Sequence, residues 1–315
     1  MPRHDPLLPP VVPPGLAAAW GGDDWRAWIA ALPGLACTFL DRWQLRPDGP
    51  PAHGVIAMVL PVVRTDGTPA ALKLQQVDEE TRGEPLALRT WDGRGAVRLL
   101  DSDPETGTML LERLDAGRSL ETLPDEGAAL ATLAGLLAEL SGYPAPAGLP
   151  QLGDLGAAML DRLPGALSRL VDAADRRLTA DCAAALREVL DRPGDRLLHW
   201  DLHYGNVLAP LPEAQRAGRG QWLAIDPKPL AGDPGFELMS ALANRWDDIL
   251  ATGDVASAVR RRFDLLTEAV GLDRSSARRW TLARVLQRTL WKAESGETAV
   301  QPRDRAIALA LLAGC

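Results

Sequence analysis

A polar loop between two short apolar runs, in residues 197–208, constrains this chain more than any other stretch. The apolar residues on both sides of the loop predict two short buried strands. The loop itself places a carboxylate at Asp201 and a carboxamide at Asn206. These two side chains can supply a proton acceptor and an oxygen ligand for a metal ion from one short turn. The alternative is a loop aspartate and a turn asparagine with capping roles only.

A second apolar run, residues 221–227, contains an aspartate near its end, at Asp226. A kinase catalytic loop has the spacing D-x-x-x-x-N, and a later aspartate binds the metal. Mg²⁺ prefers oxygen ligands from one or two carboxylates together with substrate phosphates. Asp201, Asn206 and Asp226 therefore form a usable set, with Asp201 as the base and the other two as metal ligands. Three unrelated capping residues are the alternative.

Lysine is rare in this chain and occurs only as Lys73, Lys228 and Lys292. Lys73 lies near the end of the second of two strand-like runs, residues 55–63 and 69–74, which a turn joins. In kinases a lysine at this place contacts the α and β phosphates of the nucleotide. The alternative is an edge-strand lysine that discourages aggregation.

Two other features of a nucleotide site are a loop that covers the phosphates and a glutamate that pairs with the lysine. No G-x-G-x-x-G precedes Lys73, and Gly54 is the glycine signal near the first strand, so a covering loop there would rely on backbone N–H groups. A kinase also needs a glutamate that pairs with this lysine. The charged, helix-like segment 77–91 offers several glutamates, including Glu80 and Glu84.

The rest of the chain divides near residue 115. Strands are expected at 96–101 and 108–114, and the second should lead into a hinge whose backbone, from Glu112 to Leu114, would face the nucleotide base. Beyond the boundary the chain is mainly helical by its apolar periodicity. Helices are expected at 23–32, 126–141, 154–172, 179–191, 235–250, 254–270, 275–294 and 303–313, and a surface loop at 209–221.

These expectations define an α+β fold with two lobes. Residues 1–115 would form a small, sheet-containing, nucleotide-binding lobe, after a proline-rich lead at 1–14. Residues 116–315 would form a mostly helical lobe that carries the catalytic loop and the acceptor site.

Composition restricts the partners. The net charge of −8 argues against nucleic acid, which requires clustered Lys and Arg, and is compatible with a cationic small molecule. Cys37, Cys182 and Cys315 are scattered and predict free thiols in a reducing compartment. No signal peptide or membrane span is evident, so we expect a cytoplasmic monomer.

The motifs H-W-D-L-H-Y-G-N-V-L, W-L-A-I-D-P-K-P and G-D-P-G-F-E-L, with W-D-G-R-G-A-V-R-L-L upstream, resemble those of the aminoglycoside phosphotransferases. The closest likeness is to the branch of streptomycin 6-phosphotransferases and hydroxyurea phosphotransferases, over roughly residues 50–250. The resemblance implies a bilobal protein-kinase-like fold and the use of ATP and Mg²⁺. It also implies phosphorylation of streptomycin at its 6-hydroxyl, which gives antibiotic resistance.

The resemblance also implies residue roles. It indicates Glu84 as the partner of Lys73, at the start of a helix because Pro85 follows it, with Glu80 in reserve. It makes His199 a structural hydrogen-bonding residue, and Asp233 is expected to organise the loop or to cap a helix.

Two substitutions separate the chain from regulated protein kinases. Trp200 replaces the arginine of H-R-D, and Asp226-Pro227-Lys228 replaces D-F-G. The chain therefore keeps residues for transfer and lacks two regulatory ones, which is typical of a small-molecule kinase.

The acceptor is less constrained by the residues. Acidic side chains at Asp161, Asp247, Asp248 and Glu294 could line a site for guanidinium groups, or could be solvated surface residues. Kinases for hydroxyurea or another small metabolite, and a non-catalytic kinase-like binding module, are the competing functions.

Overall fold

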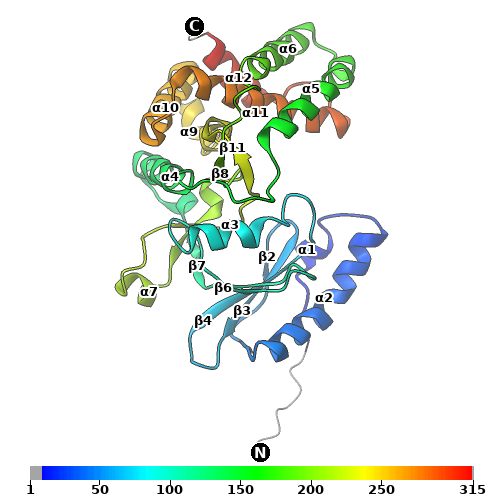
Figure 1. The fold of residues 1–315 in the computed structure, drawn as a ribbon, viewed down its shortest axis with the longest axis vertical. Helices are drawn as coiled ribbons and strands as arrows, with labels where there is room; N and C mark the ends of the chain where they lie inside the picture. Colours follow the sequence, from blue (N-terminus) through cyan, green and yellow to red (C-terminus); the bar gives the residue numbers. More distant parts are fainter. Residues whose placement is uncertain (1–8, 314–315) are drawn as a thin grey trace, which may run out of the picture.

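The computed structural model describes residues 9–313 and has a sheet-containing part and a helical part (Figure 1). The described N-terminal stretch from residue 9 leads into the sheet-containing part. The predicted lead at 1–14 lies partly, and Cys315 wholly, outside the described residues.

The N-terminal part is built on a six-stranded antiparallel sheet in the order β1-β3-β4-β6-β5, with β2 paired to β3. The predicted hairpin is its centre, since Ala57 to Val63 pair in register with Gln75 to Pro69. The strands are β1 (Arg46–Pro47), β2 (Ala52–His53), β3 (Ala57–Val63), β4 (Pro69–Gln75), β5 (Leu99–Ser102) and β6 (Met109–Glu112).

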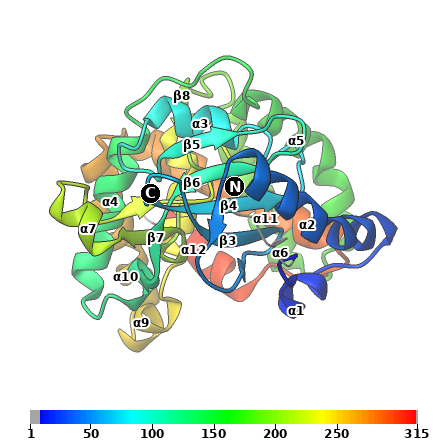
Figure 2. The ribbon, with the colours of Figure 1, turned by 90° about the horizontal axis from the view of Figure 1, so that it is seen from below.

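Three helices accompany this sheet: α1 (Pro14–Ala17), α2 (Asp23–Arg42) and α3 (Glu84–Trp91). Helix α2 lies along one side of the sheet (Figure 2). It is longer than the predicted 23–32, because it continues through Pro33. Its apolar face extends to Phe39 and Leu40, which are buried in a core shared with strands of the sheet. This packing outweighs the local cost of a proline within the helix.

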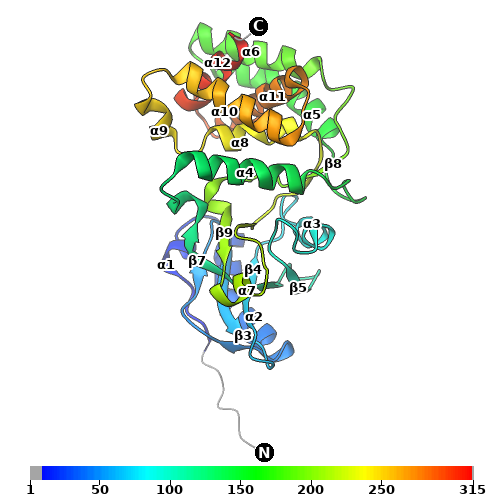
Figure 3. The ribbon, with the colours of Figure 1, turned by 90° about the vertical axis from the view of Figure 1, so that its left-hand side faces the viewer.

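Two small sheets lie where the chain crosses into the helical part. One has the order β10-β9-β7, from β7 (Leu114–Ser119), β9 (Val207–Pro210) and β10 (Leu223–Ala224). The other pairs β8 (Arg196–Leu198) with β11 (Leu230–Gly232). The expected boundary at residue 115 lies within β7. Figure 3 shows α4 directly beside β7 and β9, as the first layer of the helical part.

The helical part contains η1 (Leu120–Thr122), α4 (Glu126–Leu140), α5 (Leu152–Arg169), α6 (Ala173–Arg187), η2 (Tyr204–Asn206), η3 (Pro234–Phe236), α8 (Leu238–Leu242), α9 (Trp246–Ala251), α10 (Val255–Val270), α11 (Arg274–Glu294) and α12 (Pro302–Leu312). The short helix α7 (Pro212–Arg216) lies beside the sheet-containing part instead (Figure 3). Many Leu and Ala side chains of the helical part belong to one continuous buried core.

Three further predicted elements also differ from the observed ones. The helix expected at 235–250 is divided into η3, α8 and α9, and Arg245 adopts a left-handed φ of 44° just before α9. The helix expected at 179–191 instead begins at Ala173, because the Asp172 side chain accepts the Ala174 N–H as an N-cap. The surface loop expected at 209–221 contains the short helix α7.

No helix within residues 9–313 is long and apolar enough to cross a membrane. Cys37 and Cys182 are free thiols.

Candidate active site

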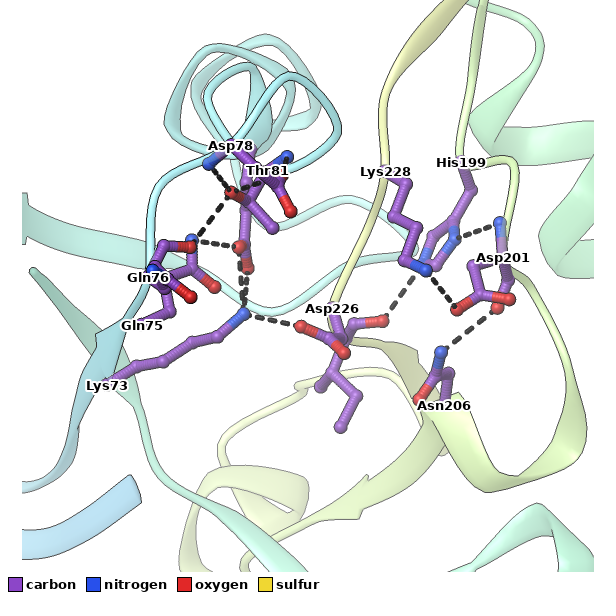
Figure 4. A network of polar contacts seen from close by, with 12 residues as sticks. Lys73, Gln75, Gln76, Asp78, Thr81, His199, Asp201, Asn206, Asp226 and Lys228 are labelled. Carbon is purple, nitrogen blue, oxygen red and sulfur yellow. Dashed lines mark hydrogen bonds and ion pairs between the residues drawn. The ribbon is translucent and has the colours of Figure 1, made fainter. Parts of the chain in front are cut away.

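The buried ion pair between Lys73 and Glu84 is the centre of the N-terminal half of the site (Figure 4). Lys73 Nζ donates to both Glu84 carboxylate oxygens, at 2.7 and 2.8 Å. Gln75 Nε2 donates to the same carboxylate at 2.9 Å. Glu84 is the first residue of α3, as its place before Pro85 predicts. The partner of Lys73 is thus Glu84, and not Glu80.

A close backbone approach positions this end of α3. A side chain at Gly83 would lie 2.7 Å from Leu149 and 2.8 Å from Pro229. Only a residue without a Cβ allows the start of α3 to lie this close to the segment that follows Asp226.

Lys73 also connects the two parts of the molecule, since its Nζ lies 2.5 Å from Asp226 Oδ1. Burial acts to lower the pKa of Lys73, but the Glu84 and Asp226 carboxylates outweigh it and raise that pKa. The Lys73 ammonium in turn lowers the pKa of Asp226. Both groups are therefore charged at neutral pH.

His199 joins the loop that carries Asp201 to the loop that carries Asp226. Its Nε2 lies 3.0 Å from the Ile225 carbonyl, and its Nδ1 accepts the Asp201 N–H at 3.4 Å. One donor and one acceptor fit a neutral imidazole. Burial lowers the pKa of His199 to about 4, which also favours the neutral ring. The predicted structural role of His199 is confirmed.

Asp201 and Asn206 lie on one turn, as their spacing predicts. Asn206 Nδ2 donates to the Asp201 carbonyl at 3.0 Å, which leaves the Asn206 side-chain oxygen for another ligand. The Asp201 side chain is 29% exposed and therefore accessible. Burial raises the pKa of Asp201, and Lys228 opposes this effect.

Lys228 was not assigned a role from the sequence. Its Nζ lies 3.8 Å from Asp201 Oδ2 and 3.2 Å from Glu80 Oε2. Glu80, the reserve partner for Lys73, therefore pairs with a different lysine.

The loop backbone before Asp201 is held in a strained conformation. Trp200 has a φ of 63°, and Asp226 has a φ of 58°. Left-handed non-glycine residues cost on the order of 1–3 kcal/mol each and persist only where the surroundings fix them. At Trp200 the N–H donates to the buried Glu237 carboxylate.

An arginine from α11 completes this support. The Arg284 guanidinium lies 5.1 Å from the Trp200 ring, 5.4 Å from Phe236 and 5.2 Å from Trp291. Such contacts are cation–π interactions. Glu237 and Arg284 were both missed by the sequence reasoning. Glu237 lies within G-D-P-G-F-E-L, but nothing in that motif specifies its partner.

The hinge candidates lie on adjoining strands. The Glu112 N–H donates to the Arg98 carbonyl at 2.9 Å, and Leu114 pairs in register with Pro210. The Glu112 carboxylate accepts from Arg219, with Nε at 3.1 Å from Oε2. The segment 209–221, expected to be a surface loop, therefore also contributes Arg219, which holds the side chain of the hinge candidate Glu112.

Gly54 lies in the connection from β2 to β3. Its N–H donates to the Ala57 carbonyl at 2.9 Å. Ile56, in the same connection, accepts the N–H of Gln76, just after the end of β4, at 3.4 Å. Gly54 is exposed.

The donor set suits a Mg²⁺ ion that shares its ligands with a substrate. Within residues 9–313 there is no group of three or more His, Cys, Asp or Glu side chains able to hold a metal by themselves. Asp226 and Asn206 offer one carboxylate and one carboxamide, and Mg²⁺ commonly takes its other ligands from water and phosphates. Asp233 accepts the Gly235 N–H at 2.8 Å and caps η3, as predicted.

Two surface cavities, of about 310 and 250 Å³, lie in the helical part. Arg260, Phe263 and Arg274 line the first, and Glu126, Asp248 and Arg262 the second. Neither lining contains Lys73, Asp201 or Asp226, so the ion pairs define the candidate site better than cavity volume does.

Residues 42–296 match the family model described as aminoglycoside/hydroxyurea antibiotic resistance kinase. A streptomycin 6-kinase of Streptomyces glaucescens is 56% identical over 303 residues, which cover 95% of this chain and 96% of that protein. A hydroxyurea phosphotransferase of Kitasatospora aureofaciens is 57% identical over 295 residues, covering 93% of this chain and 82% of that protein.

Among solved structures, the fold is similar to that of a thermostable mutant of an aminoglycoside phosphotransferase in ternary complex with ADP and hygromycin B. The TM-score is 0.57 at 15% identity, over 87% of this chain and 97% of that one. The predicted α+β, bilobal kinase-like fold is confirmed.

Proposed function

Because this chain belongs to the aminoglycoside/hydroxyurea antibiotic resistance kinase family, we propose that it transfers the γ-phosphoryl group of ATP to the 6-hydroxyl of streptomycin. The chain is a kinase by family and fold. The observation that carries the choice of acceptor is the 56% identity to a streptomycin 6-kinase across almost the full length of both chains.

The roles of the site residues follow from their positions. Asp201 accepts the proton of the attacking hydroxyl, because its carboxylate is accessible and its loop is fixed by His199 and Asn206. Lys73, held by Glu84, binds the α and β phosphates. These roles depend on positioning more than on basicity.

The remaining assignments concern the nucleotide and its metal. Asp226 and Asn206 would hold Mg²⁺, which when bound neutralises charge on the nucleotide phosphates. The backbone of Glu112 and Leu114 faces the base, and Gly54 lies in the loop that covers the phosphates. In this proposal residues 1–115 form the nucleotide-binding lobe and residues 116–315 the lobe that binds the acceptor.

Streptomycin carries two guanidinium groups, which favour pairing with carboxylates. The acidic candidates Asp161, Asp247, Asp248 and Glu294 are all exposed. Glu294 lies 3.4 Å from Arg162, so an acceptor guanidinium would have to compete with that arginine. We further propose that the enzyme acts as a monomer in the cytoplasm.

Hydroxyurea is the second candidate acceptor, because a relative with that activity in its name is 57% identical. The two acceptors differ in charge and size, and they share the same phosphoryl-transfer chemistry. They can therefore be separated by turnover alone.

The test is a steady-state phosphorylation panel with streptomycin, kanamycin, hydroxyurea and small metabolic alcohols, followed by NMR of the product. We expect turnover of streptomycin with the phosphate on the 6-oxygen, and loss of that turnover in Asp201→Ala. Turnover of only hydroxyurea, kanamycin or a metabolite would refute the acceptor assignment and leave the kinase assignment intact.

A further inference from the structure

Lys228 lies in a segment whose backbone is fixed on both sides. Its N–H donates at 3.0 Å to the carbonyl of His199, two residues before Asp201. Prolines at 227 and 229 restrict the flanking backbone. Pro229 also packs against Gly83, at the start of α3. The ammonium group is therefore presented from a rigid support.

The Lys228 side chain reaches into the space between the two functional aspartates (Figure 4). It makes one contact of hydrogen-bond length, to Glu80 at 3.2 Å, and a longer one to Asp201 at 3.8 Å. An ammonium group has three donors. Within residues 9–313 these donors are not saturated, and the side chain is 35% exposed, so a ligand can reach it.

The chemistry of transfer requires positive charge at this place. In the proposed reaction the acceptor hydroxyl is bound to Asp201 and attacks the γ-phosphoryl group, whose oxygens face the metal ligand Asp226. The phosphoryl group must therefore lie between these two carboxylates. Lys73 is engaged with Glu84 and Asp226 and serves the inner phosphates. Lys228 is the cation placed next to Asp201.

We propose that Lys228 is a further catalytic residue, whose ammonium group donates hydrogen bonds to the phosphoryl group during transfer. This inference rests on the proposed function, because it assumes phosphoryl transfer at Asp201. The acceptor oxygen forms the new O–P bond, and the bond from the γ-phosphorus to the bridging oxygen breaks. The bridging oxygen keeps the electron pair and leaves with ADP, and the hydroxyl proton passes to Asp201. Lys228 stays protonated throughout and stabilises charge on the γ-phosphoryl oxygens.

A purely structural role for Lys228 makes different predictions. The Glu80–Lys228 pair connects the turn before α3 to the helical part, so it could act only as a link between the lobes. In that case Glu80→Gln would lower activity as much as loss of the lysine. A catalytic Lys228 instead makes the lysine matter far more than its partner Glu80.

The experiment compares Lys228→Met with Lys292→Met, which removes an exposed lysine in the last turn of α11. Turnover is measured with the acceptor that the wild type uses. Affinities for ADP and for a non-transferable ATP analogue are measured by calorimetry. We expect Lys228→Met to lower kcat by about 100-fold or more, as for loss of a donor to a transition-state oxyanion. Its affinity for the analogue should fall while its affinity for ADP stays within about threefold, and Lys292→Met should match the wild type.

Lys228→Gln, which keeps a polar side chain, serves as the second variant if Lys228→Met does not fold. A kcat within threefold of the wild type for a folded Lys228 variant would overturn the proposal, and so would an equal loss in Glu80→Gln. If the wild type phosphorylates none of the acceptors, the proposed function fails, and the ratio of analogue to ADP affinity still decides the role of Lys228.

Discussion

Glu237 allows a quantitative test of how the catalytic loop is supported. The residue is 2% exposed, and its carboxylate accepts the N–H of Trp200, the residue before the proposed base. Its other oxygen has no hydrogen-bond partner among the described residues. Burial raises the pKa of Glu237 to about 7, although the backbone N–H groups of Trp200 and His199 and the charge of Arg284 act against it.

The sign of the effect on stability follows from this direction. Between pH 4.5 and 7 the native protein keeps a proton on Glu237 that the unfolded chain has lost, so stability falls as the pH rises. The pKa gap, from 4.5 to about 7, corresponds at about 1.4 kcal/mol per pH unit to about 3 kcal/mol. The stabilisation is present at low pH and is lost as the pH rises through about 7.

Glu237→Gln removes the titration and keeps an acceptor for the Trp200 N–H. The free energy of unfolding of both proteins is measured by urea titration with tryptophan fluorescence from pH 4.5 to 8. We expect the wild type to lose about 3 kcal/mol relative to the variant over this range. Glu268→Gln, at an exposed position of α10, should run parallel to the wild type. Parallel curves for wild type and Glu237→Gln would refute the reasoning.

The other predictions concern the transfer machinery. Asp201→Ala should lower kcat by about 10³-fold or more while nucleotide still binds, because the role of Asp201 lies with the acceptor. Calorimetry measures the nucleotide affinity and single-turnover kinetics measure the transfer step. Near-wild-type turnover would contradict the prediction. Asp226→Ala should abolish the gain in nucleotide affinity on adding Mg²⁺, measured by titrations with and without the metal. An unchanged gain would show that Asp226 is not a ligand of the metal. Glu84→Gln should remove one of the two ionic partners of Lys73 and lower kcat about 10- to 100-fold. Glu79→Gln, in the exposed turn before α3, should have no effect in the same assay.

Local sequence patterns determined a large part of this protein. Two apolar runs joined by a turn were enough to predict the β3–β4 hairpin and the place of Lys73 in it. Pro85 was enough to predict a helix that starts at Glu84, since a proline is favoured in the first turn of a helix. The spacing of Asp201 and Asn206 put both on one turn, because the four intervening residues allow little freedom within a short loop. These features depend on neighbours close in the chain.

The tertiary structure decided which distant groups meet. Lys228 contacts Glu80 and Asp201, and Arg284 stacks against Trp200 from a helix that begins more than 70 residues later. The sequence contains many arginine and acidic residues with the same chemistry, so no local pattern selects these partners. The packing of α11 and the close approach of Gly83 to Pro229 select them. The same reason explains the division of the segment 235–250, where burial against neighbouring helices replaces the single helix that periodicity favours. Periodicity measures the intrinsic preference of a segment, and long-range contacts decide its final course.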